Sequence, residues 1–372
     1  MLITNATAFV GGKFQANTDI LVQNGLITAI GKGLSAPEQN VINVQGDYLL
    51  PGFVDIHIHA FMGMEVMQGE VAIRHMSREL KKVGVAGFLP TTMSASAEAT
   101  KKALHGIYAV MQNPEPDGAV VLGAHMEAPF LHPQKAGAQL AQYFLLPNQE
   151  NWDSYVGPYA SIVRIVTLAP DREGALDFIP FLCQKGIVVS LGHTNATAET
   201  THQATEAGAT HVTHLFNAQS ALHHRMPGVA GAALVDDRLY CEVIADGIHL
   251  HSDIVALAYR AKGREKLVVI TDAMEASGMQ DGNYHLGGQV VHVKNGVARL
   301  ADGSLAGSTL TMQQALHNVV QYSAVSTDDA ITMCTLTPAQ SIRANFIGQM
   351  TLGSVGIFSR YSPSFTFVST LG

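Results

Sequence analysis

Six residues of the types that bind metal ions stand at the ends of short apolar runs in this sequence. They are His57, His59, Glu127, His193, His214 and Asp272. Short continuous apolar runs are typical of β-strands buried in a parallel sheet, and the strands of a parallel barrel all end on one face. Imidazoles and carboxylates suit zinc, with iron and manganese as alternatives. The pattern predicts a metal site that activates water for hydrolysis.

His57 and His59 are separated by one residue. A strand has a period of two, so both imidazoles are expected on one side and Ile58 on the other. Two nitrogen ligands on one face can hold a divalent ion. The alternative, a pair of hydrogen-bonded histidines at a barrel mouth, stays open for this motif taken alone.

Glu127 closes the apolar run 120–126, and His193 closes the run 187–192. A buried carboxylate needs a cation or hydrogen-bond donors, so a metal and a salt bridge to Lys or Arg are both possible partners for Glu127. His211 and His214 differ by an odd number of positions and face opposite ways on one strand. His214, nearer the carboxyl end, is the predicted ligand, and His211 is predicted to be structural.

Asp272 completes the run 267–271, the last strand of the series. A carboxylate there is expected to point over the barrel centre. An N-cap for a following helix is the alternative. Each ligand candidate has such an alternative, but six of them after five separate strands together favour a metal site.

Length and composition allow a large core with 47% hydrophobic residues in 372. An α/β barrel commonly takes roughly 200–250 residues, which leaves material for a second unit. We predict a (β/α)₈ barrel domain at 51–344 and a small β-sheet domain from 1–50 plus 345–372. The formal charge of -8, without long runs of either sign, argues against nucleic-acid or membrane partners.

Cysteine usage and the start of the chain bear on location. Cys183, Cys241 and Cys334 are isolated, with no C-x-x-C spacing. The first residues lack the basic and apolar regions of a signal peptide, and no segment reaches the ~20 apolar residues of a membrane span. A reducing, cytoplasmic setting is expected.

The predicted elements follow from local patterns. Asn24-Gly25 between the runs 20–23 and 26–30 predicts a hairpin, as does Asn295-Gly296 within 289–300. Helices are predicted at 309–323 and 328–334, and the short runs of 348–372 are expected to pair with the N-terminal strands. The eight barrel strands are predicted near 54–57, 87–90, 120–127, 162–168, 187–192, 211–216, 241–245 and 267–271.

Several motifs resemble those of the amidohydrolase superfamily and, within it, of the N-acetylglucosamine-6-phosphate deacetylase family. The opening P-G-F-V-D-x-H-x-H at 51–59 is a superfamily mark. The segments G-H-T-N-A at 192–196, T-H-L-F-N-A at 213–218 and A-D-G-I-H at 245–249 are specific to the deacetylases. The matching segments span nearly the whole chain.

The resemblance implies two metal positions. Glu127, His193 and His214 would bind one ion. His57 and His59 would hold a second, with Glu127 or Asp272 contributing to both. Asp272 would accept a proton from the attacking water and return it to the leaving amine.

The resemblance also implies a substrate site. Asn217, the backbone at Ala218, Arg225 and His249 would hold the sugar phosphate, with the arginine reaching across from a neighbouring subunit of a homodimer. A guanidinium suits a phosphate because it can bind two of its oxygens. Gln139 stands where some members have a histidine near the substrate carbonyl.

The implied reaction is removal of the acetyl group of N-acetylglucosamine 6-phosphate, which yields glucosamine 6-phosphate and acetate in amino-sugar breakdown. Alternatives are the galactosamine epimer, an N-acyl amino acid, a cyclic amide or a nucleobase as substrate, or a non-enzymatic scaffold on a degenerate barrel. Ala60, Phe61 and Ala128 depart from the family pattern beside the ligands.

Overall fold

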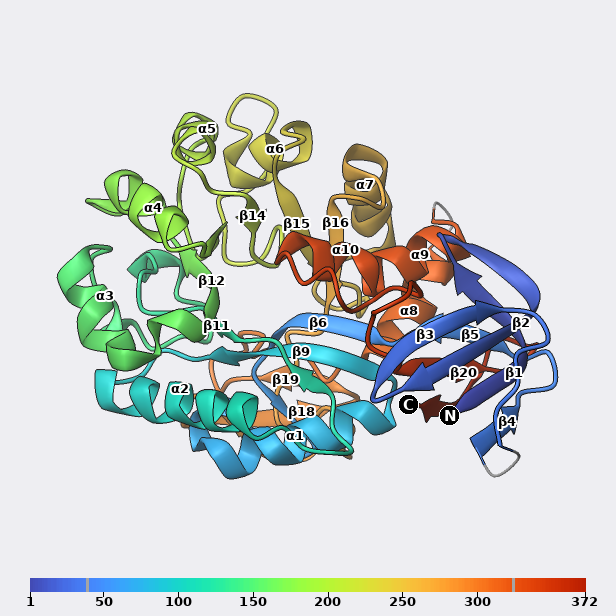
Figure 1. Cartoon of the computed structure of the whole chain (residues 1–372). Coiled ribbons are helices and arrows are strands. Elements are labelled where there is room, and N and C mark those ends of the chain that lie inside the picture. Colours follow the sequence, from blue (N-terminus) through green and yellow to red (C-terminus); the bar gives the residue numbers. More distant parts are fainter. Residues whose placement is uncertain (38–39, 323–324) are drawn as a thin grey trace.

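Parallel strands surrounded by helices form the larger part of the computed structural model, which describes residues 1–37, 40–322 and 325–372 (Figure 1). The strands follow one another around the barrel in nearly sequential order and are buried on both faces. They are β6 (Phe53–Ile58), β9 (Val85–Thr92), β10 (Val120–Val121), β11 (Ala124–Met126), β12 (Val163–Leu168), β13 (Val188–Leu191), β14 (His211–Val212), β15 (Tyr240–Ile244) and β16 (Leu267–Ile270).

The predicted barrel is confirmed in its order and is nearly closed. Neighbouring strands pair in parallel along most of the ring. The first and last strands, β6 and β16, meet through a bridge between Ile58 and Ala273. Here the Asp272 N–H donates to the His57 carbonyl at 2.9 Å, and the His59 N–H donates to Ala273 at 3.0 Å. The ring therefore closes at residues of the predicted metal site.

Two strands are shorter than predicted because the backbone turns. The run 120–127 is divided into β10 and β11 at Gly123, which has φ of 140°, and a Cβ there would lie 2.6 Å from the Ile162 carbonyl oxygen. Only a glycine fits this position. The run 211–216 is extended only over β14, because His214 and Phe216 have φ of 28° and 77°.

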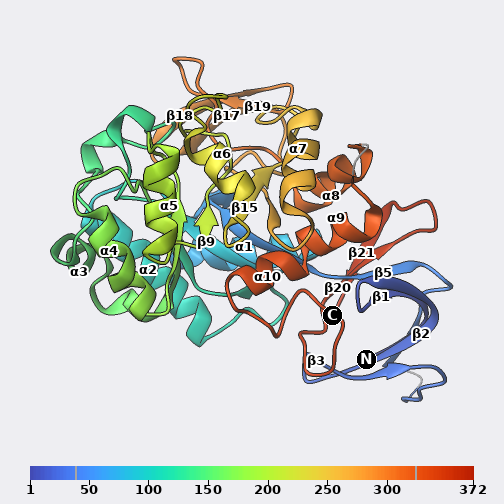
Figure 2. The ribbon, with the colours of Figure 1, turned by 90° about the horizontal axis from the view of Figure 1, so that it is seen from above.

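The helices cover the outside of the barrel (Figure 2). α1 shows why they form: Ala72, Ile73, Met76 and Leu80 make one buried stripe at helical spacing. The helices are α1 (Glu70–Lys82), α2 (Ala97–Gln112), α3 (Gln149–Val156), α4 (Ala175–Gln184), α5 (Ala198–Glu206), α6 (Gly228–Val235), α7 (Ser252–Lys262), α8 (Met312–Gln321), α9 (Thr327–Cys334) and α10 (Leu336–Ser341).

The predicted C-terminal helices are confirmed with changed ends. α8 starts after Thr311, whose side chain accepts from the Gln314 N–H, and Ser323 lies outside the described residues. α9 starts after the equivalent cap Ser326. In the described part of the chain, no helix combines the length and apolar character needed to cross a membrane.

A seven-stranded sheet beside the barrel joins the two ends of the chain, as predicted. Its main order is β21-β20-β5-β1-β2-β3, with β4 paired to β1. Asn24 and Gly25 form the predicted turn with φ of 51° and 75°. The division at 1–50, 51–344 and 345–372 stays a prediction. The strands are β1 (Leu2–Val10), β2 (Lys13–Gln23), β3 (Leu26–Gly31), β4 (Val41–Asn43), β5 (Tyr48–Pro51), β20 (Phe358–Tyr361) and β21 (Phe367–Leu371).

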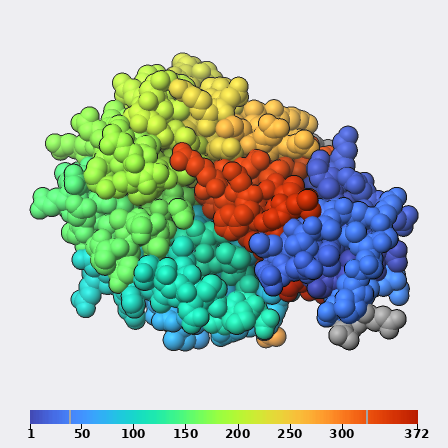
Figure 3. All heavy atoms as spheres, viewed as in Figure 1, coloured from blue at the N-terminus to red at the C-terminus, as the bar shows by residue number. Residues whose placement is uncertain are grey.

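C-terminal segments lie between the N-terminal sheet and the barrel on the face that Figure 3 shows. They appear there as a red band between the blue sheet and the green and yellow parts. This placement agrees with the antiparallel pairing of β20 with β5.

A three-stranded sheet follows the last barrel strand and was only partly predicted. The hairpin at Asn295-Gly296 joins β18 (Gln289–Lys294) to β19 (Val297–Arg299), and β17 (Gly282–Leu286) adds a third strand. β17 has few apolar residues, so its pattern gave no strand signal. Ala60 and Phe61, which depart from the family pattern, form β7 (Ala60–Phe61). This strand pairs with β8 (Met64–Glu65).

Candidate metal centre

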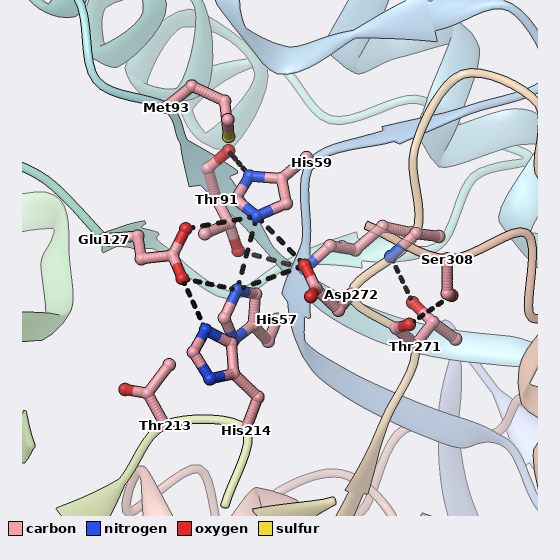
Figure 4. A network of polar contacts seen from close by, with 12 residues as sticks. His57, His59, Thr91, Met93, Glu127, Thr213, His214, Thr271, Asp272 and Ser308 are labelled. Atoms are coloured by element: carbon pink, nitrogen blue, oxygen red, sulfur yellow. Dashed lines mark hydrogen bonds and ion pairs between the residues drawn. The ribbon is translucent and has the colours of Figure 1, made fainter. Parts of the chain in front are cut away.

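All six predicted ligands meet at the carboxyl ends of the barrel strands. Figure 4 shows five of them, namely His57, His59, Glu127, His214 and Asp272. His57 lies on β6, and the others lie in the turns that leave β6, β11, β13, β14 and β16. All six residues are buried, from 0% exposed at His57 to 8% exposed at Asp272. The structure therefore brings together residues that are more than two hundred positions apart in the sequence.

Glu127 lies between two pairs of histidines. Its Oε1 is 3.1 Å from the Nε2 atoms of both His193 and His214, which are themselves 3.1 Å apart. On the other side, Oε2 is 3.3 Å from His59 Nε2, and Oε1 is 3.5 Å from His57 Nε2. Among the described residues, the partners of Glu127 are histidines and the amide of Gln139, and they include no Lys or Arg of the alternative prediction.

The Asp272 carboxylate forms ion pairs with the first-strand histidines His57 and His59. Its Oδ1 lies 3.1 Å from His59 Nε2 and 3.5 Å from His57 Nε2. The residue has φ of 49° and its carbonyl accepts the Ser308 N–H at 2.8 Å. The backbone turns into an extended connection here, so the alternative role as a helix N-cap is not what the structure shows.

Hydrogen bonds to the Nδ1 atoms of the histidines determine the protonation of the Nε2 atoms that face the centre. The Nδ1 atoms of His57, His59 and His193 lie 2.9, 3.2 and 2.7 Å from oxygens of Glu242, Thr91 and Lys135. These carboxylate and carbonyl oxygens only accept, so each Nδ1 carries a proton. In the neutral rings Nε2 then presents a lone pair to the centre.

Lone pairs and carboxylate oxygens that face one another in a buried site need a cation between them. The donor atoms of His57, His59 and Glu127 lie within 4.8 Å of one another, as do those of Glu127, His193 and His214. The donor set of imidazoles and one shared carboxylate fits a divalent metal of the zinc type.

The pKa values of these residues also indicate a place for positive charge. Burial alone would lower the pKa of His57, but Glu127, Asp272 and Glu242 outweigh it and raise this pKa to about 9. His59 follows the same balance, with its pKa raised to about 10 by Asp272 and Glu127. For Asp272, burial raises the pKa, and His57 and His59 outweigh it and lower the pKa to about 2. The centre therefore favours positive charge.

Three of the ligand residues have a backbone conformation that is unfavourable for side chains with a Cβ. His193, His214 and Asp272 have φ of 46°, 28° and 49°. Such conformations cost about 1–3 kcal/mol each and occur mostly where function requires them. The turns that follow β13, β14 and β16 therefore aim the side chains inward at some cost in stability.

A cavity of about 300 Å³ opens onto this centre. Four of the five predicted substrate residues line it, together with Lys135: they are Gln139, Asn217, Ala218 and His249. Gln139 is fixed by the Ser94 N–H, which donates to its Oε1 at 2.7 Å, while its Nε2 donates to Glu127. His249 is fixed by Asp246, 2.7 Å from its Nδ1.

Two predicted residues lie elsewhere. Arg225 is exposed on the loop after β14, where its guanidinium contacts His224 at 2.7 Å, and it does not line the cavity of its own subunit. His211 is buried away from the centre, where its Nδ1 lies 3.0 Å from Thr210 Oγ1 and its ring stacks on Tyr240.

Glu242 and Lys135 contact the ligands and were not predicted. Glu242 is a charged residue inside the apolar run 241–245, and a charge placed in a buried strand could have signalled its role. Lys135 contributes a carbonyl oxygen, which any residue type could supply, so the sequence carried no signal for it.

Comparisons with known proteins agree with this geometry. The model of the Amidohydrolase family matches residues 48–355. The N-acetylglucosamine-6-phosphate deacetylase of Lysinibacillus sphaericus is 36% identical over 354 residues, covering 95% of this chain and 91% of that protein. The N-acetylgalactosamine-6-phosphate deacetylase of Escherichia coli O157:H7 is 38% identical over 308 residues, covering 82% and 80%.

A solved structure extends the likeness to three dimensions. It is that of a mutant of N-acetyl-D-glucosamine-6-phosphate deacetylase from Mycobacterium smegmatis in complex with N-acetyl-D-glucosamine-6-phosphate. The two chains superpose with a TM-score of 0.91 at 29% identity, over 100% of this chain and 97% of that one. The chain therefore belongs to the amidohydrolase family, as its strand-end motifs indicated.

Proposed function

We propose that this chain hydrolyses the N-acetyl group of N-acetylglucosamine 6-phosphate to give glucosamine 6-phosphate and acetate, a step of amino-sugar breakdown in the cytoplasm. The observation that carries the proposal is Asp272 beside a shared histidine and glutamate centre at the base of a cavity of about 300 Å³. Pockets for small ligands start at about this volume. Relatives of both sugar specificities support the substrate class.

The metal assignment follows the two histidine pairs. Glu127, His193 and His214 would hold one divalent ion, and His57, His59 and Asp272 a second, with Glu127 reaching both. Zinc is the proposed metal, with iron or manganese as alternatives, and one or two ions are compatible with this donor set. Bound there, the metal would supply Lewis acidity toward the acetyl carbonyl and toward water.

Asp272 is the proposed proton carrier. An aspartate carboxylate is ionised at neutral pH, so Asp272 can accept a proton from the water that attacks the amide carbon. It then delivers that proton to the amine nitrogen as the C–N bond breaks. The cavity brings the substrate to this carboxylate, because His59 and Asp272 both form part of its lining.

The remaining cavity residues would position the sugar phosphate. Gln139 has an amide N–H group beside Glu127 and would orient the acetyl carbonyl. Asn217, Ala218 and His249 line the cavity and would hold the sugar and its phosphate. Arg225 would enter from the neighbouring subunit of a homodimer, since it is exposed and outside the cavity of its own chain.

N-acetylgalactosamine 6-phosphate is the second candidate substrate, because a relative at 38% identity carries that name. The deciding experiment measures acetate release from both phosphorylated epimers and from unphosphorylated N-acetylglucosamine, with metal content determined on the same sample. We expect the largest kcat/KM for N-acetylglucosamine 6-phosphate. A larger value for the galactosamine epimer would reassign the substrate, and equal rates without phosphate would refute the proposal.

Asp272→Asn should keep the metal and lose turnover. The amide has nearly the same shape but cannot take up the proton, and general-base catalysis contributes about 10²–10⁴-fold to a rate. Steady-state assays and metal analysis of the purified variant would test this. Asp237→Asn, at an exposed position, is the control. Near-normal turnover in Asp272→Asn would exclude the assigned role.

Glu127→Gln should lose metal from both positions, whereas His59→Asn should affect only one. The reason is that the oxygens of Glu127 contact both histidine pairs, while His59 belongs to one. Metal content per chain, measured by mass spectrometry after dialysis, would report the difference. Glu199→Gln, at an exposed glutamate, serves as control. Unchanged metal content in Glu127→Gln would contradict the shared-ligand assignment.

Arg225 can be tested by subunit mixing. Arg225→Ala and Asp272→Asn should each be inactive as homodimers, but a mixed dimer has one complete site if the arginine crosses the interface. Random reassociation would restore about a quarter of wild-type activity. Arg238→Ala, at another exposed arginine, should stay active throughout. Mixed dimers that are verified by mass yet inactive would place Arg225 in its own subunit's site.

A further inference from the structure

Glu242 is a buried carboxylate that the proposed reaction does not use. It lies in the middle of β15 with 0% exposure, between the buried residues Cys241 and Val243. A carboxylate at such a position is costly unless its oxygens are fully satisfied. Its Oε1 has no hydrogen-bond partner among the described residues. Fold stability alone therefore does not account for an acid at this position.

The other oxygen of Glu242 contacts both halves of the metal centre. Oε2 lies 2.9 Å from His57 Nδ1 and accepts the backbone N–H of His214 at 3.2 Å. His57 belongs to the first-strand pair, and His214 belongs to the other pair. One carboxylate oxygen thus links the His57 ring to the His214 backbone, and Glu127 contacts the rings of the same two residues.

The contact to His57 differs from the contacts of the other ligand rings. His59 and His193 are oriented by backbone carbonyls of Thr91 and Lys135, whereas His57 is oriented by a carboxylate. A carboxylate on the outer nitrogen fixes the tautomer and makes the inner nitrogen a stronger ligand. His125, whose ring packs against His57, is already bonded to Ile56 and Thr167 and does not compete for Glu242.

The contact to His214 acts on the backbone. His214 has φ of 28°, an unfavourable conformation that turns its ring toward Glu127. The hydrogen bond from its N–H to Glu242 stabilises this turn. Its Nδ1 has no partner among the described residues, so the backbone contact is an important restraint on this ligand.

We infer that Glu242 is a positioning residue of the metal centre, which orients His57 directly and fixes the turn of His214. The inference rests on the proposed two-ion site. Its main effect falls on the ion held by His57 and His59, since Glu242 contacts the His57 ring itself but only the backbone of His214. The His214 ring keeps its contacts to Glu127 and His193 without it.

Glu242→Met tests the inference, because methionine has a similar length and no acceptor oxygen. Dissociation constants of both ions would be measured by competition with a chelator for wild type and variant. We expect the second ion to bind about 10–100-fold more weakly, with a much smaller change for the first. Glu242→Gln retains an acceptor oxygen and should recover part of the affinity. Asp19→Asn, at a buried acid of the small sheet, is the control.

Wild-type affinities for both ions in Glu242→Met, or an equal loss of both, would overturn the inference. If this variant does not fold, Glu242→Gln decides: a weaker second ion supports the role, because a neutral amide is the weaker acceptor, and unchanged binding refutes it. If the wild-type enzyme releases acetate but holds one ion, the inference about Glu242 fails and the proposed reaction stands. If the wild-type protein holds two ions but releases no acetate, the proposed reaction fails and the inference about Glu242 stands.

Discussion

The shared contact of one carboxylate with four imidazoles is the constraint on which the rest of the structure depends. Glu127 lies within 3.1–3.5 Å of His57, His59, His193 and His214, all facing inward by their Nε2 atoms. The buried carboxylates need compensating positive charge here and, outweighing the effect of burial, they raise the pKa values of the His57 and His59 rings accordingly. The parallel barrel provides the arrangement, because its strands all end on one face and so deliver side chains from distant segments to one place.

The clustering of the six predicted ligands could be expected from the sequence because each residue ends a strand, and strand ends are visible in the apolar pattern. Barrel order and the joining of both chain ends were predictable for similar reasons. The interruption of the strand at Gly123 and the end of the strand after Val212 could not be predicted, since they depend on backbone angles set by tertiary contacts. β17 lacks an apolar pattern, and the carbonyl of Lys135 has no signature in the side chain.

Glu242 shows another limit of prediction from the sequence. Its residue type was visible in the apolar run 241–245, but the sequence offers no way to pair it with His57, 185 positions away. The same holds for Gln139 and Glu127, which only the loop after β11 brings together. Ligand identity follows from local sequence, whereas the contacts that orient each ligand depend on how loops return to the barrel mouth.

The barrel's first and last strands meet where the Asp272 N–H donates to His57 and the His59 and Ala60 N–H groups donate to Ala273. Thr271 adds hydrogen bonds to the Asp55 carboxylate. The side chains of His57, His59 and Asp272 face one another across that same junction. Anything bound between them would tie the two edges of the sheet together and stabilise the closed ring by mass action. Filling this site would then raise the free energy of local opening between the first and last strands. Hydrogen exchange of the backbone amides at their junction reports that free energy directly.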